Sequence, residues 1–151
     1  MVNLNDGIHY NWEKTLSYNA DVTMVVGAPN KGKTYGLRAY ALNRAIKRGC
    51  RFVEVCRTLD ERDAVKKSYF DKLAATDDDF GAFEYKCEAN EFKYRIKDAK
   101  RGTPWNTCGY VVAFAEMQGT KKRTFADVEN IIFDEAILES IDSTHTTNGI
   151  C

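Results

Sequence analysis

The sequence predicts an α/β domain built around a mostly parallel sheet, with an antiparallel hairpin joined to that sheet. Apolar runs at residues 22–26, 51–56, 110–115 and 130–135 are typical of buried strands. Segments with helical periodicity follow the first two runs, and two segments with strictly alternating side chains lie further along the chain. With 151 residues, 44% of them apolar, the chain is long enough for one compact domain with its own core.

The first predicted elements are a strand and a helix. Residues 22–26 form a short β-branched run that ends at a glycine, so we expect a buried strand. Residues 33–48 are typical of a helix, because apolar side chains recur on one face and basic residues fill the last turn. Gly49 supplies the stop signal.

The loop between this strand and this helix carries a phosphate-binding pattern. Its sequence is GAPNKGKT, in which Gly27, Gly32, Lys33 and Thr34 have the spacing G-x-x-x-x-G-K-T. Glycines permit turns whose backbone N–H groups point at anionic oxygens, and the helix that follows adds its positive end. We expect Lys33 to reach the phosphates of ATP and the Thr34 hydroxyl to bind Mg²⁺. A glycine-rich turn that binds nothing is the alternative.

The middle of the chain predicts a strand, a helix and a hairpin. Residues 51–56 have the apolar composition of a strand, and Thr58 opens a capping-box pattern that predicts a helix to about residue 75. Residues 83–87 and 92–96 alternate apolar and charged side chains on either side of an Ala-Asn turn. This alternation predicts an antiparallel hairpin with one face in water.

The last apolar run, NIIFDE, ends in two carboxylates. A strand that ends in an acid is common, and taken alone such a carboxylate is often merely solvated. Beside a phosphate loop, neighbouring carboxylates can hold magnesium and orient the attacking water. We therefore expect Asp134 to bind the metal together with Thr34, and Glu135 to act as the catalytic residue with Lys33. The predicted nucleotide-binding residues are Gly27, Ala28, Pro29, Asn30, Lys31, Gly32, Lys33, Thr34 and Asp134.

Composition excludes some classes of function. The 22 basic and 22 acidic residues balance, so overall charge gives no argument for a strongly basic nucleic-acid binder. The five cysteines are odd in number and lack zinc-like spacing, which favours a reduced cytosol and no structural zinc. The chain shows neither a signal peptide nor 18 consecutive apolar residues, so we expect a soluble protein without a membrane partner.

Several other side chains allow two interpretations. Arg57 follows a strand, where it is either a sensor of the γ-phosphate or a salt-bridged surface residue. Trp12 and Tyr18 either stack on adenine or belong to the core. Two sets of cations either contact a nucleic-acid backbone or are solvated, as edge-strand lysines often are, and the second set could instead contact the nucleotide of a neighbouring subunit. These cations are Lys93, Arg95, Lys97, Lys100 and Arg101 in one set, and Lys121, Lys122 and Arg123 in the other.

Six segments of the chain follow one another in a characteristic order. They are Asn11-x-x-Lys14-x-Leu16-Ser17-Tyr18, GAPNKGKT, RFVEVCRT, EFKYRIKDAK, GYVVAFAEM and NIIFDEA. In this order they resemble the ATPase domain of the DNA encapsidation ATPases of small tailed phages. The resemblance covers nearly the whole chain, although only the loop and NIIFDEA are specific motifs.

The resemblance implies a three-layer α/β/α P-loop NTPase fold of the additional-strand, catalytic-glutamate class (ASCE), to which terminases also belong. It implies hydrolysis of Mg-ATP that drives double-stranded DNA into a preformed capsid. The implied partners are further copies in a homo-oligomeric ring, the phage portal or connector, and a structural packaging RNA. The implied place is the host cytoplasm, at the procapsid during phage assembly.

The resemblance also implies roles for single residues. Carried across by position, Lys33 and Thr34 hold phosphate and magnesium, Asp134 holds the metal and Glu135 the water. Packaging ATPases often have an arginine within the loop, where Lys31 is the nearest cation in this sequence. The family continues with further strands, an arginine finger and a second domain, so we expect residues 1–151 to be a single P-loop ATPase domain from a fragment or a truncated relative.

Two other functions fit the same motifs. One is a DNA helicase or a transposition-type ATPase with the same core. The other is an assembly module that binds nucleotide only to fix its oligomeric state, without turnover.

Overall fold

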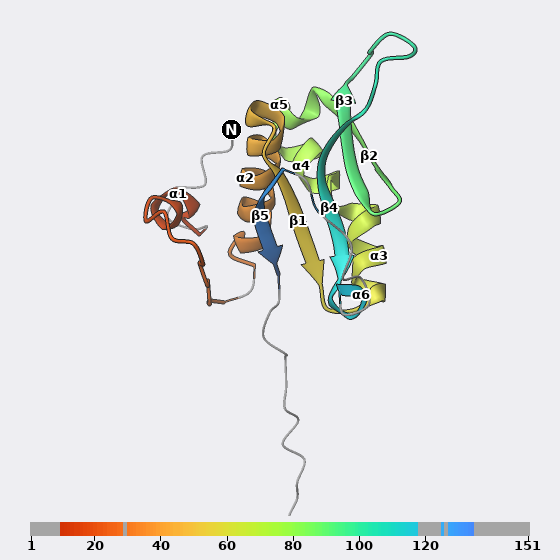
Figure 1. The fold of residues 1–151 in the computed structure, drawn as a ribbon. Helices are drawn as coiled ribbons and strands as arrows, with labels where there is room; N and C mark the ends of the chain where they lie inside the picture. The colour runs from red at the N-terminus through yellow and green to blue at the C-terminus, as the bar shows by residue number, and fades with distance from the viewer. Residues whose placement is uncertain (1–9, 29, 118–124, 126, 135–151) are drawn as a thin grey trace, which may run out of the picture.

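The computed structural model describes residues 10–28, 30–117, 125 and 127–134, and it has a mixed α/β fold. Five strands form one sheet in the order β2-β3-β4-β1-β5 (Figure 1). The strands are β1 (Arg51–Cys56), β2 (Phe83–Glu88), β3 (Glu91–Ile96), β4 (Asn106–Ala113) and β5 (Val128–Phe133). The helices are α1 (Trp12–Leu16), α2 (Lys33–Arg48), α3 (Leu59–Ser68), α4 (Asp71–Thr76), α5 (Asp78–Gly81) and α6 (Phe114–Met117).

The sheet joins a parallel part to the predicted antiparallel hairpin. The central strand β1 is parallel to both of its neighbours, β4 and β5. Strand β3 is antiparallel to β2 on one side and to β4 on the other. The β2–β3 turn lies at Ala89 and Asn90, whose φ angles of 50° and 68° are left-handed, as a tight hairpin requires. The predicted hairpin and the predicted strand at residues 51–56 are confirmed.

Helix α2 has the bounds that the sequence predicts. It ends at Gly49, whose φ of 73° is left-handed and whose N–H donates to the carbonyl of Ala45 at 3.0 Å. Ala41, Leu42 and Ala45 are buried along the face that contacts the sheet. Burial of this apolar stripe fixes the helix against the sheet.

The main core lies between the sheet and helices α2 to α5. Its centre is a group of aromatic rings, with Tyr69 and Phe92 stacked at 4.4 Å between ring centroids and Phe52 next to both. These three side chains are almost completely buried. Burial of a large apolar side chain stabilises the fold by roughly 1.5–3 kcal/mol. The aromatic group therefore holds β1, β3 and the segment after α3 together.

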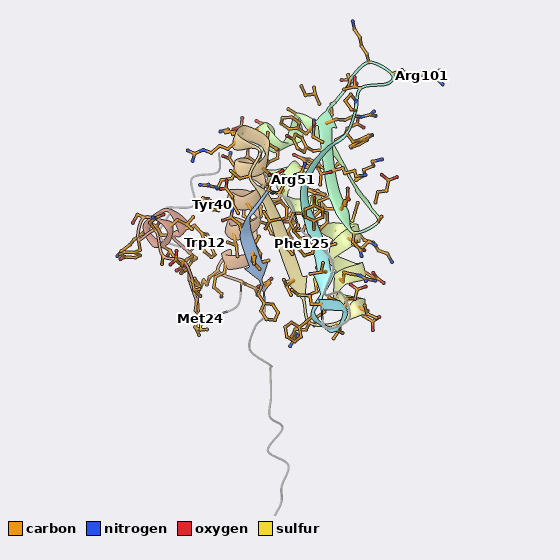
Figure 2. The ribbon with its side chains drawn as sticks, in the orientation of Figure 1. Trp12, Met24, Tyr40, Arg51, Arg101 and Phe125 are labelled. Atoms are coloured by element: carbon orange, nitrogen blue, oxygen red, sulfur yellow. The ribbon has the colours of Figure 1, made fainter. Side chains whose placement is uncertain are left out.

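The two faces of the sheet differ in their cover. Helices α2 to α5 lie on one face (Figure 1), which carries Phe52 and Cys56. The opposite face carries Val53, Val55 and Val112, which pack with Phe125 from the connection between β4 and β5 (Figure 2). The part of the chain that the structure describes therefore forms two layers and not the expected three. The reason is that α2 before β1 and α3 to α5 after it all bury their apolar sides on the same face of β1.

The predicted strand at residues 22–26 is wrong. This segment pairs with no strand of the described chain, and the exposed fractions of Val22, Met24 and Val26 are 84%, 77% and 74%. Figure 2 shows Met24 away from the sheet. Strands β4 and β5 take both edges of β1, and the run does not pair with the outer edge of β5 either. A β-branched composition favours an extended chain, but a strand forms only where a partner strand supplies hydrogen bonds.

Three other predictions need correction. The helix expected to reach residue 75 is divided into α3 and α4 at Tyr69 and Phe70, whose rings are buried in the aromatic core. The last strand is a sheet edge and not a fully buried strand: Ile132 is 2% exposed, whereas its neighbour Ile131 is 74% exposed. The run at residues 110–115 is a strand only to residue 113, after which α6 begins.

The close approach of β1 and β4 gives a test of this packing. A Cβ atom at Gly109 would lie 2.8 Å from the ring and from the carbonyl oxygen of Phe52. We expect Gly109→Ala to lower the free energy of unfolding by about 1–3 kcal/mol, because the site is already filled. The measurement is urea unfolding followed by circular dichroism. Asn106→Ala on the exposed start of β4 is the control, and equal stability of both variants would contradict the packing.

Candidate functional site

The candidate site lies where the start of α2 meets the end of β5. The Thr34 hydroxyl donates a hydrogen bond to Oδ2 of Asp134 at 2.9 Å. Thr34 is the second residue of α2, and Asp134 directly follows the last residue of β5. The fold therefore brings into contact the two side chains that the sequence assigns to the metal. Glu135 lies outside the described residues.

Two residues of the loop before α2 have left-handed backbone conformations. Gly32 stands at the start of the helix with φ 71° and ψ 13°, a left-handed conformation that favours glycine. Asn30 also has a positive φ of 58°. Because the N-cap residue Gly32 has no side chain, it cannot cap the first N–H groups of α2, which are the kind of donors that bind anions at helix N-termini. Pro29 lies outside the described residues.

The Lys33 side chain folds back over this loop. Its Nζ donates to the carbonyl of Gly27 at 2.9 Å and also to the carbonyl of Ala28. A lysine ammonium is a mobile point charge with three donors. It can therefore exchange these carbonyl oxygens for the oxygens of a phosphate chain that enters the loop.

The N-terminal segment anchors the phosphate loop. The N–H of Tyr10 donates to the carbonyl of Lys31 at 2.8 Å, and Nε1 of Trp12 donates to the carbonyl of Lys33 at 3.0 Å. Trp12 is buried, whereas Tyr18 is 69% exposed. For Trp12 the structure supports a place in the core over stacking on adenine. Its hydrogen bond also fixes the backbone of the loop.

An ion pair between buried Glu54 and partly buried Arg38 lies beside the Thr34–Asp134 contact, and sequence reasoning did not identify it. Glu54 lies in β1 and is 1% exposed. Nε of Arg38 donates to both carboxylate oxygens of Glu54 at 3.1 Å, and Nη2 of Arg38 donates to Oε1. The signal was present in the strand RFVEVC, where one glutamate interrupts an apolar run. A charge in a buried strand requires a partner.

Burial and pairing act in opposite directions on these two groups. Burial raises the pKa of Glu54, and the hydrogen bonds from Arg38 oppose that effect. Burial has the largest effect on Arg38 and lowers its pKa, but the hydrogen bonds to Glu54 and the charges around it together raise the pKa above its usual value. The charge of Asp134 raises the pKa of both groups. Arg38, Glu54 and Asp134 therefore form one electrostatic group.

The structure pairs several of the other candidate cations with carboxylates. Arg57 forms an ion pair with Glu61 at 2.8 Å, and this contact lowers the pKa of Glu61. In the β2–β3 hairpin, Lys93 pairs with Glu88 at 2.9 Å. Arg95 pairs likewise with a glutamate of the facing strand. These contacts favour a surface role over contact with a ligand.

Three cations of the same set lie in the connection between β3 and β4. Lys97, Lys100 and Arg101 are exposed, and in the part of the chain that the structure describes no carboxylate pairs with them. Figure 2 shows Arg101 pointing away from the body of the protein. Residues 121–123 lie outside the described residues.

The described cysteines and acids form no metal cluster of three or more ligands. Cys50, Cys56, Cys87 and Cys108 are free thiols, and burial raises the pKa of Cys56 to about 11. Within the described ranges, no helix combines the length and the apolar character that a membrane span needs.

Comparisons with known proteins agree on one family. The profile of the family described as podovirus DNA encapsidation protein (Gp16) matches residues 4–150. The DNA packaging protein of Bacillus phage phi29 is 29% identical over 147 residues, which cover 97% of this chain and 40% of that protein. The chain thus spans about two fifths of the length of this relative.

Solved structures show the same relationship. The N-terminal domain of the DNA packaging ATPase from bacteriophage phi29 matches with a TM-score of 0.73 and 30% identity, over 89% of this chain and 63% of that one. A chain of the phi29 viral genome packaging motor assembly matches with a TM-score of 0.70 and 30% identity, over 93% of this chain and 39% of that one.

The hydrogen bond between Thr34 and Asp134 can be tested without any ligand. We expect Thr34→Val to lower the free energy of unfolding by about 0.5–1.5 kcal/mol, because the carboxylate loses its donor. Thr34→Ser keeps the hydroxyl and is the matched control in the same urea titration. If the valine variant is as stable as the serine variant, the two side chains are not in contact.

Proposed function

The chain belongs to the podovirus DNA encapsidation protein (Gp16) family, and on this premise we propose that it is the ATP-binding part of a phage DNA packaging motor. The proposed reaction is hydrolysis of Mg-ATP, coupled to movement of double-stranded DNA into a preformed capsid. The observation that carries the proposal is the contact between Thr34 and Asp134 at the start of a helix that follows a glycine-rich loop.

The oxygens at this contact suit magnesium. Mg²⁺ prefers oxygen ligands and is usually held by one or two protein groups together with phosphates and water. A threonine hydroxyl and a carboxylate 2.9 Å apart are such a pair, one in the first turn of α2 and the other directly after β5. Thr34 and Asp134 would therefore hold the ion, which neutralises charge that develops on the phosphates.

The other residues of the loop would bind and orient the nucleotide. The N–H groups at the start of α2 and the residues from Gly27 to Gly32 surround the phosphates, which they bind without side-chain bulk. Lys33 leaves the carbonyls of Gly27 and Ala28 and pairs with the phosphates as a cation. From the sequence alone, we assign the orientation of the attacking water to Glu135.

The proposed partners follow from the family. They are double-stranded DNA, further copies in a ring, the portal or connector, and a structural packaging RNA, all at the procapsid in the host cytoplasm. Closure around ATP in one subunit would change the contacts to its neighbour and so move DNA. Lys97, Lys100 and Arg101, the exposed cations of the β3–β4 connection, would suit contact with a phosphate backbone.

The relatives favour packaging over the helicase and transposition alternatives, because the matched proteins are described as DNA packaging proteins. An assembly module without turnover retains the same loop and the same metal contact. It therefore differs from a motor only in hydrolysis.

The nucleotide site predicts different effects for two substitutions. We expect Lys33→Ala to weaken Mg-ATP binding at least about tenfold, because it removes a charge-assisted contact to phosphate. We expect Glu135→Gln to retain binding and to lose hydrolysis. Calorimetry and phosphate release are the measurements, with Lys47→Ala at the exposed end of α2 as the control. Binding that is insensitive to Lys33→Ala would contradict the site, and wild type without turnover would favour the assembly module.

The exposed cations of the β3–β4 connection predict a salt-dependent interaction with DNA. We expect the triple change Lys97→Ala, Lys100→Ala and Arg101→Ala to weaken binding to duplex DNA and to reduce its salt dependence. The slope of log affinity against log salt should fall by about 0.9 for each DNA phosphate that the variant no longer neutralises. Fluorescence anisotropy is the measurement. The control is a triple alanine variant of Lys47, Arg48 and Lys72, which are exposed elsewhere, and it should leave the slope unchanged. If both triple variants change the slope equally, the β3–β4 connection does not bind DNA.

A further inference from the structure

The pair of buried Glu54 and partly buried Arg38 has no role in the function proposed so far. Such an ion pair is weak evidence for stability, because the cost of removing charges from water often exceeds their attraction. Apolar residues of similar size at both positions often serve stability equally well. Stability alone therefore does not explain why this pair occurs at this position in the fold.

The fold places this pair next to the proposed metal ligand by two independent routes. Arg38 follows Thr34 by four residues in α2, so both side chains project from one side of the helix. Glu54 is the register partner of Ile132 in the adjacent strand β5, and Asp134 lies two residues beyond Ile132. Because strand residues alternate between faces, Glu54 and Asp134 approach α2 from the same face of the sheet.

The guanidinium of Arg38 is fixed in this position. Its Cζ lies 4.8 Å from the centroid of the Tyr69 ring, and its nitrogens bind both oxygens of Glu54. Tyr69 is itself part of the buried aromatic core. The cation is therefore held between a ring and a carboxylate, and it does not move freely toward the Thr34–Asp134 contact.

We propose that Arg38 and Glu54 are positioning residues whose balanced charges set the affinity of Asp134 for a divalent cation. The inference rests on the function proposed above. Arg38 alone would compete with the cation for the charge of Asp134, since like charges near one carboxylate oppose each other. The negative charge of Glu54 balances the guanidinium and so removes that competition. The guanidinium itself stays fixed in its position. The charges of these two residues, rather than their packing, are what the site requires.

Substitutions that change charge without changing shape separate this role from a structural one. Glu54→Gln keeps the size of the side chain but frees the charge of Arg38. We expect this variant to need roughly tenfold more Mg²⁺ for half-maximal ATP binding, because a buried charge acts on its neighbour through a low dielectric. Binding of ATP without Mg²⁺ should stay within about twofold of wild type or become tighter, because one more positive charge then faces the phosphates.

The double variant Arg38→Gln with Glu54→Gln removes both charges and retains side chains that can hydrogen-bond. We expect it to restore the Mg²⁺ dependence of wild type. A purely structural pair predicts the reverse, since the double variant would be at least as damaged as the single one. Arg38→Gln alone provides a second test if Glu54→Gln fails to fold. Its Mg²⁺ midpoint should lie at or below that of wild type, and a higher midpoint would overturn the inference.

The experiment titrates Mg²⁺ into each full-length variant with N-methylanthraniloyl-ATP, a fluorescent analogue of ATP, and repeats the nucleotide titration in EDTA. Circular dichroism and urea unfolding check that each variant is folded. The role of the pair would be refuted if Glu54→Gln left the Mg²⁺ midpoint unchanged. It would also be refuted if Glu54→Gln weakened nucleotide binding equally with and without Mg²⁺ and the double variant did not restore it. If wild type itself shows no Mg²⁺-dependent binding that Lys33→Ala abolishes, the proposed function fails and the inference fails with it.

Discussion

The contact between Thr34 and Asp134 is the constraint on which the candidate site depends. It joins the start of α2 to the end of β5, two elements that come from distant parts of the sequence. The contact forms because α2 packs its apolar stripe on the sheet and because β5 lies directly beside β1. The aromatic core under β1 and β3 keeps that sheet rigid, so packing remote from the site determines its geometry.

The elements with a strong local signal could be predicted from the sequence. Helix α2 has a continuous apolar face and a glycine after its last turn, and the β2–β3 hairpin alternates charged and apolar side chains around a tight turn. The capping residue Thr58 is also found as expected, since its hydroxyl accepts from the N–H of Glu61. In each case neighbours within a few residues determine the structure.

The features that the sequence did not predict depend on distant partners. The run at residues 22–26 has the composition of a buried strand, but it pairs with no strand of the described chain and its apolar side chains are exposed. Tyr69 fits the predicted helical period and is the C-cap of α3, but the helix ends there and the ring joins the aromatic core. Glu54 was visible as a charge within an apolar strand, but its partner Arg38 became evident only when helix and strand were seen together. Local patterns carry no information about which surfaces meet.

The most direct test of the central claim is a crystal structure of the chain with Mg²⁺ and a non-hydrolysable analogue of ATP. The account predicts that the metal lies between the hydroxyl of Thr34 and the carboxylate of Asp134, with the phosphates enclosed by residues 27–34. A nucleotide bound elsewhere, or a carboxylate of Asp134 that points away from the metal, would contradict it.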